Sequence, residues 1–437
     1  MSGYTAVIMA GGKGTRLSSV TNGEIPKPMV PVAGKPILAR QVEALRACGV
    51  RQFVFVVGHL HEQIEAYFGD GSAFGVSVRY IVEREPLGSA GALFYLKGTL
   101  ADDFFLVFGD TVFDIDIERM LRFHREKHAA VTLLAHPNSH PYDSDLVLAD
   151  GEGRVTGFLS KNEPHGDRHN LVNAAFFILS PRALDTLDAP ARLDMEKGLV
   201  ARRIEEYGDV FAYRTTEYIK DAGTPDRLAS VGRDLENGTV AARNLRRPQK
   251  CIFLDRAGTI NRYAGFIPSP DALELLPRAA EAIARINASG YLAVVVTNQP
   301  VLARGECTAE ELDAIFCRME TELGRRGAYV DAVYYCPHHP DRGFAGEVPE
   351  LKTDCACRKP KPGLLLRAAE ELHIDLAASW SVGDSWRDVE AGKSAGTRTA
   401  LLTCGEPLRG GEGADLVCAD LAEAVGQILG LTEEQTR

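Results

Sequence analysis

The chain has no apolar run of about 18 residues, the shortest length typical of a membrane-spanning helix. No basic stretch precedes the first strand-like segment, so a secretory leader is not expected. Cysteine is sparse, with nine in 437 residues; this excludes a disulfide scaffold and is typical of reduced thiols inside a cell. Internal repeats and low-complexity tracts are missing, which excludes a repeat protein. We therefore expect a soluble, cytoplasmic protein with no membrane partner.

Excess basic charge is also missing. The formal net charge is −11, which argues against a general nucleic-acid-binding protein because such proteins carry a basic surface. Hydrophobic residues make up 45% and charged residues 25% of the chain, as in ordinary globular proteins. Small anionic substrates stay compatible with this charge, since a glycine-rich loop with a few basic residues binds them locally. The composition leaves a homo-oligomer open.

Apolar segments of strand length alternate with amphipathic segments of helix length. Near the N-terminus the expected strands are "TAVIMA", "QFVFVVG" and "FFLVFGD", a pattern typical of a parallel sheet with helices on both faces. Helices become sparse between residues 130 and 180, which predicts an antiparallel extension. A second alternation begins at "KCIFLD". We predict an α/β protein with a Rossmann-like mixed sheet in residues 1–242, a linker at 243–250 and a parallel sheet in 251–437.

Several N-terminal motifs suit a nucleoside triphosphate. "MAGGKGTRL" follows the first strand, and its glycines let backbone N–H groups approach phosphate oxygens. It is neither the G-x-G-x-x-G fingerprint nor a P-loop. Lys27 lies in "IPKPM", Asp110 ends "FFLVFGD" and Asp221 precedes a Gly-Thr turn. Two separated carboxylates suit Mg²⁺ that bridges a triphosphate and an attacking phosphate, although each aspartate alone could equally cap a helix.

In this order the motifs resemble the sugar-1-phosphate nucleotidyltransferase family over residues 5–235. The family's G-G-x-G-T-R-L, P-K-P-M, G-D and D-x-G-T-P signatures are matched, and its E-x-P-L-G-[ST]-A-G is matched closely by Glu85–Gly91. The resemblance implies a GT-A-like fold, with nucleotide contacts from Gly11, Gly12, Gly14, Thr15 and Gly88. It further implies phosphate contacts from Arg16 and Lys27, Mg²⁺ at Asp110 and Asp221, and sugar-phosphate contacts from Lys161 and Asn173. Two departures lie on the sugar side: Lys161 stands in a changed motif, S-K-N-E, and Ala175 replaces a glycine.

The transfer itself needs no protein nucleophile. The sugar-phosphate oxygen attacks the α-phosphate in line and pyrophosphate leaves, so catalysis comes from positioning and charge neutralisation. Glycine loops, a lysine, an arginine and two aspartates meet this requirement without a Ser–His dyad.

The C-terminal half places chemistry-bearing residues at expected strand ends. They are a carboxylate, a hydroxyl, a lysine and a metal-binding acid, as an aspartyl-phosphate mechanism requires. They resemble the haloacid dehalogenase superfamily, and within it the heptose 1,7-bisphosphate phosphatases. The resemblance implies Asp255 as nucleophile, Thr297 and Lys359 as phosphoryl contacts, Arg358 as a substrate contact, and Mg²⁺ at Asp255 and Asp384.

Two short motifs, "CPH" and "CAC", bracket a loop rich in proline, glycine and charge. Such a loop buries too little apolar area to order itself, so a structural zinc ion is the economical explanation. Its ligands would be Cys336, His338, Cys355 and Cys357, the positions that the phosphatase branch uses. The alternative is four unrelated reduced side chains.

Ala257 stands where the phosphatases have a second aspartate, which protonates the leaving oxygen and later activates water. Loss of a general acid/base costs about 10²–10⁴ in rate. Pro300-Val301 also replaces Ser-Gly, and Ser385 stands where a lysine is frequent. We hypothesise a weak or inactive phosphatase domain, retained for stability, assembly or sugar delivery. The alternative is a fully bifunctional enzyme, with Ala257 tolerated or introduced by design.

The two resemblances imply consecutive steps, because a heptose bisphosphate phosphatase makes the 1-phosphate that a nucleotidyltransferase activates. The expected function is transfer from GTP to D-glycero-α-D-manno-heptose 1-phosphate, with guanine inferred from the likeness alone. Mannose 1-phosphate or a pseudo-sugar phosphate is the alternative substrate. A sensor or scaffold that binds ligands without turnover is the alternative of another class.

Overall fold

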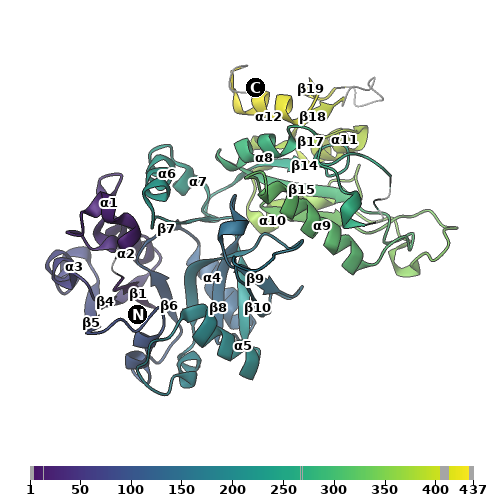
Figure 1. The fold of residues 1–437 in the computed structure, drawn as a ribbon. Coiled ribbons are helices and arrows are strands. Elements are labelled where there is room, and N and C mark those ends of the chain that lie inside the picture. The colour runs from purple at the N-terminus through teal and green to yellow at the C-terminus, as the bar shows by residue number, and fades with distance from the viewer. Residues whose placement is uncertain (1–3, 13, 266, 268, 404–412, 433–437) are drawn as a thin grey trace. The chain divides into compact units, whose positions relative to one another are not determined.

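The computed structural model of the chain describes residues 4–12, 14–265, 267, 269–403 and 413–432. They form two compact units (Figure 1). Unit 1 holds the chain up to His136, Asp145–Leu159 and Val172–Asn244. Unit 2 holds Pro137–Ser144, Ser160–Leu171 and the chain from Leu245. The longest segments of the two units meet between residues 244 and 245. The domain bounds 1–242 and 251–437 that were inferred from the sequence stay a prediction.

Unit 1 contains a mixed nine-stranded sheet. Its parallel part comprises β1 (Tyr4–Ala10), β4 (Val50–Val57), β5 (Ser77–Val82) and β6 (Phe104–Phe108). Its largely antiparallel part comprises β8 (Val131–His136), β9 (Leu146–Ala149), β10 (Val155–Leu159), β11 (Val172–Leu179) and β12 (Val210–Arg214). The main path runs β10-β9-β11-β6-β1-β4-β5, and β8 joins β11 to β12. The predicted mixed sheet is confirmed.

Apolar helix faces cover this sheet. In α2 (Ile37–Ala47), Leu38, Val42 and Leu45 recur at helical spacing, are fully buried and share a core with Phe55 of β4. Burial of each such side chain contributes roughly 1.5–3 kcal/mol. The other helices are α1 (Ser18–Thr21), α3 (His61–Phe68), α4 (Ile117–Glu126), α5 (Ala201–Tyr207), α6 (Pro225–Glu236) and α7 (Thr239–Ala242).

A two-stranded antiparallel sheet joins distant parts of unit 1. Strand β7 (Thr111–Asp114) pairs with β13 (Tyr218–Asp221), with Thr111 opposite Asp221. Asp110 directly precedes β7, so this register brings it beside the end of β13. A separate hairpin is formed by β2 (Pro31–Val32) and β3 (Lys35–Pro36).

Unit 2 contains a six-stranded parallel sheet in the order β16-β15-β14-β17-β18-β19. In β14 (Lys250–Leu254), Cys251 and Phe253 enter one core cluster, whereas Ile252 and Leu254 enter another. This alternation buries both faces, as the predicted parallel sheet requires. The other strands are β15 (Tyr291–Asn298), β16 (Ala332–Cys336), β17 (Trp380–Gly383), β18 (Arg398–Leu402) and β19 (Leu416–Cys418).

Helices of unit 2 complete these two cores. They are α8 (Ala279–Asn287), α9 (Ala309–Gly324), α10 (Gly363–Leu372), α11 (Trp386–Ala395) and α12 (Leu421–Leu429). Two further segments of unit 2, residues 137–144 and 160–171, contact α9; the Tyr142 hydroxyl, for example, donates to the Thr321 carbonyl at 3.1 Å. None of the helices in the described ranges has the length and apolar character of a membrane span.

Two candidate active sites

Three charged side chains of unit 1 converge on Gly223. Lys27 forms an ion pair with Asp110, and the Gly223 amide donates to the Asp221 carboxylate. A Cβ atom at Gly223 would lie 2.6 Å from Asp221 Oδ1 and 2.7 Å from Lys27 Nζ. It would also lie 3.2 Å from Asp110 Oδ2. A side chain at position 223 would displace the two carboxylates and the lysine from these positions.

The predicted magnesium ligands of unit 1 therefore lie together. The side chains of Lys27 and Asp110 are 14% and 20% exposed, so a ligand can reach them. Asp221 Oδ2 accepts a hydrogen bond from Arg227 Nη1 at 2.6 Å. Carboxylate oxygens from two separate segments fit the ligand preference of Mg²⁺.

The glycine-rich loop follows β1 at the carboxyl end of the parallel strands, where α/β sheets bind ligands. Gly14 has a φ of 65°, and a Cβ there would lie 3.0 Å from Lys27 Cβ. A Cβ on Gly11 would lie 2.5 Å from Glu83 Oε2, whereas Gly12 has open space. Thr15 and Arg16 are exposed beside Gly12. The close packing of the loop thus explains two of its glycines, and Gly12 stays free for the approach of a ligand.

The remaining predicted contacts of the transferase lie further along the chain. Gly88 has a φ of 78°, and a Cβ there would lie 2.4 Å from the Leu193 carbonyl oxygen. Asn173 Nδ2 donates to Glu196 Oε1 at 2.5 Å, and burial raises the pKa of Glu196. Lys161 belongs to segment 160–171 of unit 2, where its Nζ lies 3.7 Å from Asp143 Oδ1.

In unit 2, one buried lysine holds two carboxylates. Lys359 Nζ donates to Asp255 Oδ1 at 2.8 Å, to Asp388 Oδ1 at 2.5 Å and to the Val296 carbonyl at 2.8 Å. Burial alone would lower the pKa of Lys359, but the charges of Asp255 and Asp388 outweigh it and raise that pKa. Lys359 is therefore charged and fixes Asp255 at the end of β14.

A third carboxylate completes this group. Ligand oxygens of Asp255, Asp384 and Asp388 lie within 4.8 Å of one another. Burial, followed by the charges of Asp255 and Asp388, raises the pKa of Asp384 to about 7, and burial also raises the pKa of Asp255. Three acids against one lysine leave negative charge uncompensated. The residues fit Mg²⁺, which prefers oxygen ligands and carboxylates.

These carboxylates open into a pocket of about 520 Å³. All predicted phosphatase residues line it, together with four arginines: Arg256, Arg304, Arg358 and Arg387. Burial, and then the charges of Arg387 and Arg304, lower the pKa of Arg358. Arg256 is 4% exposed, and within the described chain its Nε and Nη1 have no hydrogen-bond partner. The pocket is therefore built for an anionic ligand.

Ala257 lines the same pocket, so its methyl group occupies a position that faces the ligand. Ser385 has a local role: its amide and hydroxyl donate to Asp388 Oδ2 at 3.1 and 2.7 Å and begin α11. The pocket thus contains Asp255 and Lys359 and lacks an acid at position 257.

The four predicted zinc ligands come together at the end of β16. Cys357 Sγ lies 3.2 Å from the Sγ atoms of Cys336 and Cys355 and 3.3 Å from His338 Nδ1. A tetrahedral zinc ion separates its sulfur and nitrogen ligands by roughly 3.3–3.8 Å. Burial and the neighbouring thiols raise the pKa of Cys336. The cluster fits a metal ion such as zinc.

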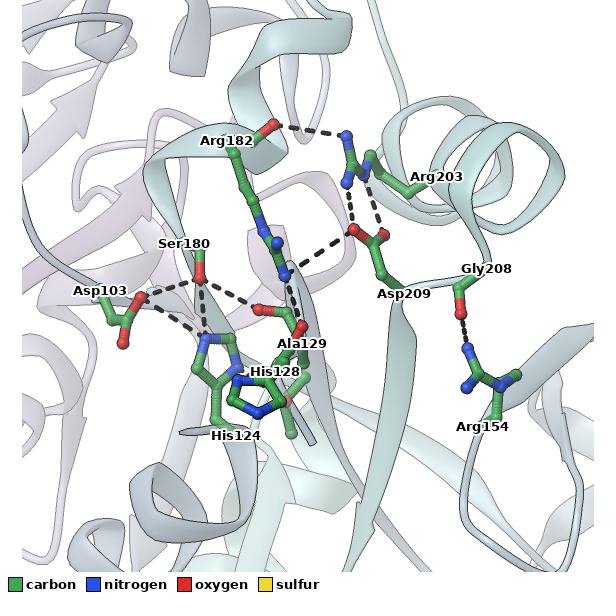
Figure 2. Close-up of polar contacts among 11 residues, drawn as sticks. Asp103, His124, His128, Ala129, Arg154, Ser180, Arg182, Arg203, Gly208 and Asp209 are labelled. Carbon is green, nitrogen blue, oxygen red and sulfur yellow. Dashed lines mark hydrogen bonds and ion pairs between the residues drawn. The ribbon is translucent and has the colours of Figure 1, made fainter. Parts of the chain in front are cut away.

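A serine, a histidine and an aspartate also meet in unit 1, beside a separate ion pair of Arg203 (Figure 2). Ser180 Oγ lies 3.1 Å from His124 Nε2 and 2.8 Å from Asp103 Oδ1. In a catalytic triad the carboxylate would orient the histidine, but here His124 Nδ1 bonds Thr132 Oγ1 at 2.8 Å. His124 is only 1% exposed, so this network is structural.

Both halves of the chain match known protein families. Residues 5–238 match the nucleotidyl transferase family. The chain belongs to that family. Its C-terminal part matches the HAD-hydrolase-like family over residues 356–424. The nucleotidyl transferase is therefore fused to a HAD-type phosphatase-like domain, as predicted.

Curated relatives divide in the same way. Mannose-1-phosphate guanylyltransferase of Mycobacterium tuberculosis is 33% identical over 245 residues, which cover 55% of this chain and 67% of that protein. D-glycero-β-D-manno-heptose-1,7-bisphosphate 7-phosphatase of Yersinia pestis is 40% identical over 175 residues, 39% of this chain and 91% of that protein.

Solved structures also match each half of this nucleotidyl transferase fusion. HddC from Yersinia pseudotuberculosis, complexed with GMP-PN, is 25% identical and covers 53% of this chain and 99% of its own, with a TM-score of 0.46. D,D-heptose 1,7-bisphosphate phosphatase from B. bronchiseptica, complexed with magnesium and phosphate, is 37% identical and covers 42% and 99%, with a TM-score of 0.36.

Three polar residues at these two sites were not predicted from the sequence. Glu83 lies against Gly11 and accepts from the Leu87 amide at 3.1 Å, and burial raises its pKa. Glu196 accepts a hydrogen bond from Asn173, and the buried Arg256 lines the pocket of unit 2. Glu83 is near the "EPLGSAG" motif, but no spacing rule singles out Glu196.

Proposed function

We propose that unit 1 transfers a guanylyl group from GTP to D-glycero-α-D-manno-heptose 1-phosphate and releases pyrophosphate. The convergence of Lys27, Asp110 and Asp221 on Gly223 carries the transfer chemistry. The family match over residues 5–238 supports the reaction class.

The residues of unit 1 would act by position and charge. The Gly12 region would receive the triphosphate, Arg16 and Lys27 would bind its phosphates, and Asn173 would contact the sugar. A sugar-phosphate oxygen forms the new bond to the α-phosphorus while the bond to pyrophosphate breaks. Mg²⁺ held by Asp110 and Asp221 would supply charge neutralisation for the phosphates.

The substrate proposal rests on both halves. The N-terminal relatives include a guanylyltransferase, and the C-terminal relatives are named as heptose-1,7-bisphosphate phosphatases. Those relatives act on the β anomer; removal of the 7-phosphate from the corresponding α anomer would yield the heptose 1-phosphate that unit 1 consumes. Mannose 1-phosphate is the second candidate, favoured by the printed activity of the mycobacterial relative.

We further propose that unit 2 binds a sugar bisphosphate but turns it over slowly. Asp255 would form a bond to phosphorus while the bond between phosphorus and the sugar oxygen breaks, and Thr297, Arg358 and Lys359 would contact the phosphoryl group. The leaving oxygen then needs a proton, and Ala257 cannot give one. Zinc at the Cys336 cluster would order the loop between the two cysteine motifs.

A substrate matrix tests the transferase proposal. Pyrophosphate release is measured for the four common nucleoside triphosphates against heptose, mannose and glucose 1-phosphates. GTP with heptose 1-phosphate should give the highest kcat/KM. A different best pair would replace the substrate, and no turnover with any pair would favour a ligand-binding scaffold.

A further inference from the structure

One face of α9 in unit 2 presents metal-ligating side chains away from the phosphatase pocket. Asp313, Cys317 and Glu320 recur at intervals of four and three residues, which places them on the same side of the helix. His169, from segment 160–171, lies against this face. No family motif in the sequence includes these positions.

The donor atoms lie at metal-ligand spacing. His169 Nε2 is 3.0 Å from Asp313 Oδ1, and Cys317 Sγ is 3.9 Å from Asp313 Oδ2. The three donors lie within 4.8 Å of one another. The Cys336 cluster has comparable separations, from 3.2 Å between Cys336 and Cys357 to 3.7 Å between Cys336 and His338.

A buried carboxylate orients the imidazole. Glu320 Oε1 lies 3.0 Å from His169 Nδ1, and Glu320 Oε2 accepts from the Asn170 amide at 2.7 Å. The Glu320 side chain is 2% exposed. A carboxylate that accepts from Nδ1–H fixes the tautomer in which Nε2 presents its lone pair, as at known zinc sites.

We propose that His169, Asp313 and Cys317 bind one divalent transition-metal ion of the zinc type. A nitrogen, an oxygen and a sulfur donor favour such an ion over Mg²⁺ or Ca²⁺, which prefer oxygen alone. On binding, the Cys317 thiol and the Nε2 of the His169 imidazolium each release a proton to solvent, so the ligands are a thiolate and a neutral imidazole. His169 and Asp313 side chains are 38% and 61% exposed, so a fourth position is open to water.

This site would tie segment 160–171 to α9 through three coordinate bonds. The competing explanation is an imidazolium held between Asp313 and Glu320 by charge alone. Both explanations use His169 and Asp313, but only the metal needs Cys317. Cys317 therefore distinguishes them.

Zinc content of the full chain tests the proposal. The purified protein is dialysed against low micromolar zinc and analysed by plasma mass spectrometry. Cys317→Ser should bind one zinc ion fewer per chain than wild type, Cys355→Ser should lose the other ion, and the double variant both. Cys48→Ser, in unit 1, is the control and should match wild type.

A second measurement tests whether a loss of zinc could result from a folding defect. Asp313→Asn changes an exposed group, and it should weaken binding of the same ion at least tenfold in a competition titration, with an unchanged circular dichroism spectrum. Equal zinc content in wild type and Cys317→Ser, or an unchanged affinity in Asp313→Asn, would overturn the metal site in favour of the charge clamp.

Discussion

The carboxylates of the two candidate sites are neutralised in different ways. In unit 1, each aspartate has its own cation: Lys27 pairs with Asp110, and Arg227 pairs with Asp221. When a nucleotide enters this site, its phosphates would replace a carboxylate as the partner of Lys27, in a site whose charges are already balanced.

In unit 2, Asp255 and Asp388 share Lys359, and burial raises the pKa of Asp255 and of the neighbouring Asp384. A proton or a divalent cation that binds among these acids would relieve their mutual repulsion. The contrast teaches that charge neutralisation in the transferase site comes from the position of each ion pair. In the phosphatase-like pocket it depends on the proton or ion that binds there.

Replacement of Asp110 should have the largest effect. Asp110→Asn removes one carboxylate from the set around Gly223, and pyrophosphate release should fall about 10³-fold, as when a preorganised charge contact is lost. Asp102→Asn, at the other end of β6, is exposed and should keep wild-type turnover. Retained activity in Asp110→Asn would contradict the role of the balanced pairs.

Restoration of an acid at position 257 should have the next largest effect. Ala257→Asp should raise phosphate release from heptose 1,7-bisphosphate about 10²-fold, the lower end for a general acid/base, because Val301 and Ser385 remain changed. The double variant Asp255→Asn/Ala257→Asp is the control and should release none. Wild-type release already near that of active phosphatases would contradict an impaired domain.

The sugar side of unit 1 offers a smaller, structural effect. Ala175 has a φ of 56° at an irregularity in β11, where glycine carries no Cβ penalty. Ala175→Gly should raise the free energy of unfolding by about 1 kcal/mol, measured by urea denaturation. Ala174→Gly, at a buried neighbouring position, should lower it by a similar amount. A loss of stability in Ala175→Gly would show that the left-handed backbone carries no strain.

The smallest effect concerns pH. Burial raises the pKa of Glu196 above its ordinary 4.5, and Asp145 and Asp194 add to this. The carboxyl group therefore stabilises the fold fully below pH 4.5, and this contribution is lost as pH rises through the folded pKa. Gln at position 196 does not ionise, so the Glu196→Gln variant does not lose stability in this way. Between pH 5 and pH 8, its free energy of unfolding should therefore rise relative to that of wild type by on the order of 1 kcal/mol. A constant difference across this range would contradict the buried charge.

The sequence anticipates the features that follow from strand order. Asp255 and Asp384 directly follow β14 and β17, and Thr297 lies near the carboxyl end of β15. The carboxyl ends of these parallel strands share one edge of the sheet. The cysteine cluster was also predictable, because both halves of its pattern are close in sequence. The lysine that bridges Asp255 and Asp388 needed the structure, since no spacing reveals which acids a buried lysine holds.

Other features depend on long-range packing. Segment 160–171 lies between two strands of the first sheet in sequence, yet its contacts group it with unit 2. His169 and Glu320 are 151 residues apart, so periodicity cannot pair them. Ala175 was recognised as a departure from glycine, but its left-handed backbone could be read only from coordinates.

The position of Lys359 has a consequence for how such a domain can change in evolution. Its ammonium group anchors two acids and a main-chain oxygen without any help from residue 257. Loss of an acid at position 257 can therefore slow hydrolysis while the hydrogen bonds of Lys359 to Asp255 and Asp388 stay intact. The arrangement of the pocket is in this sense separable from turnover.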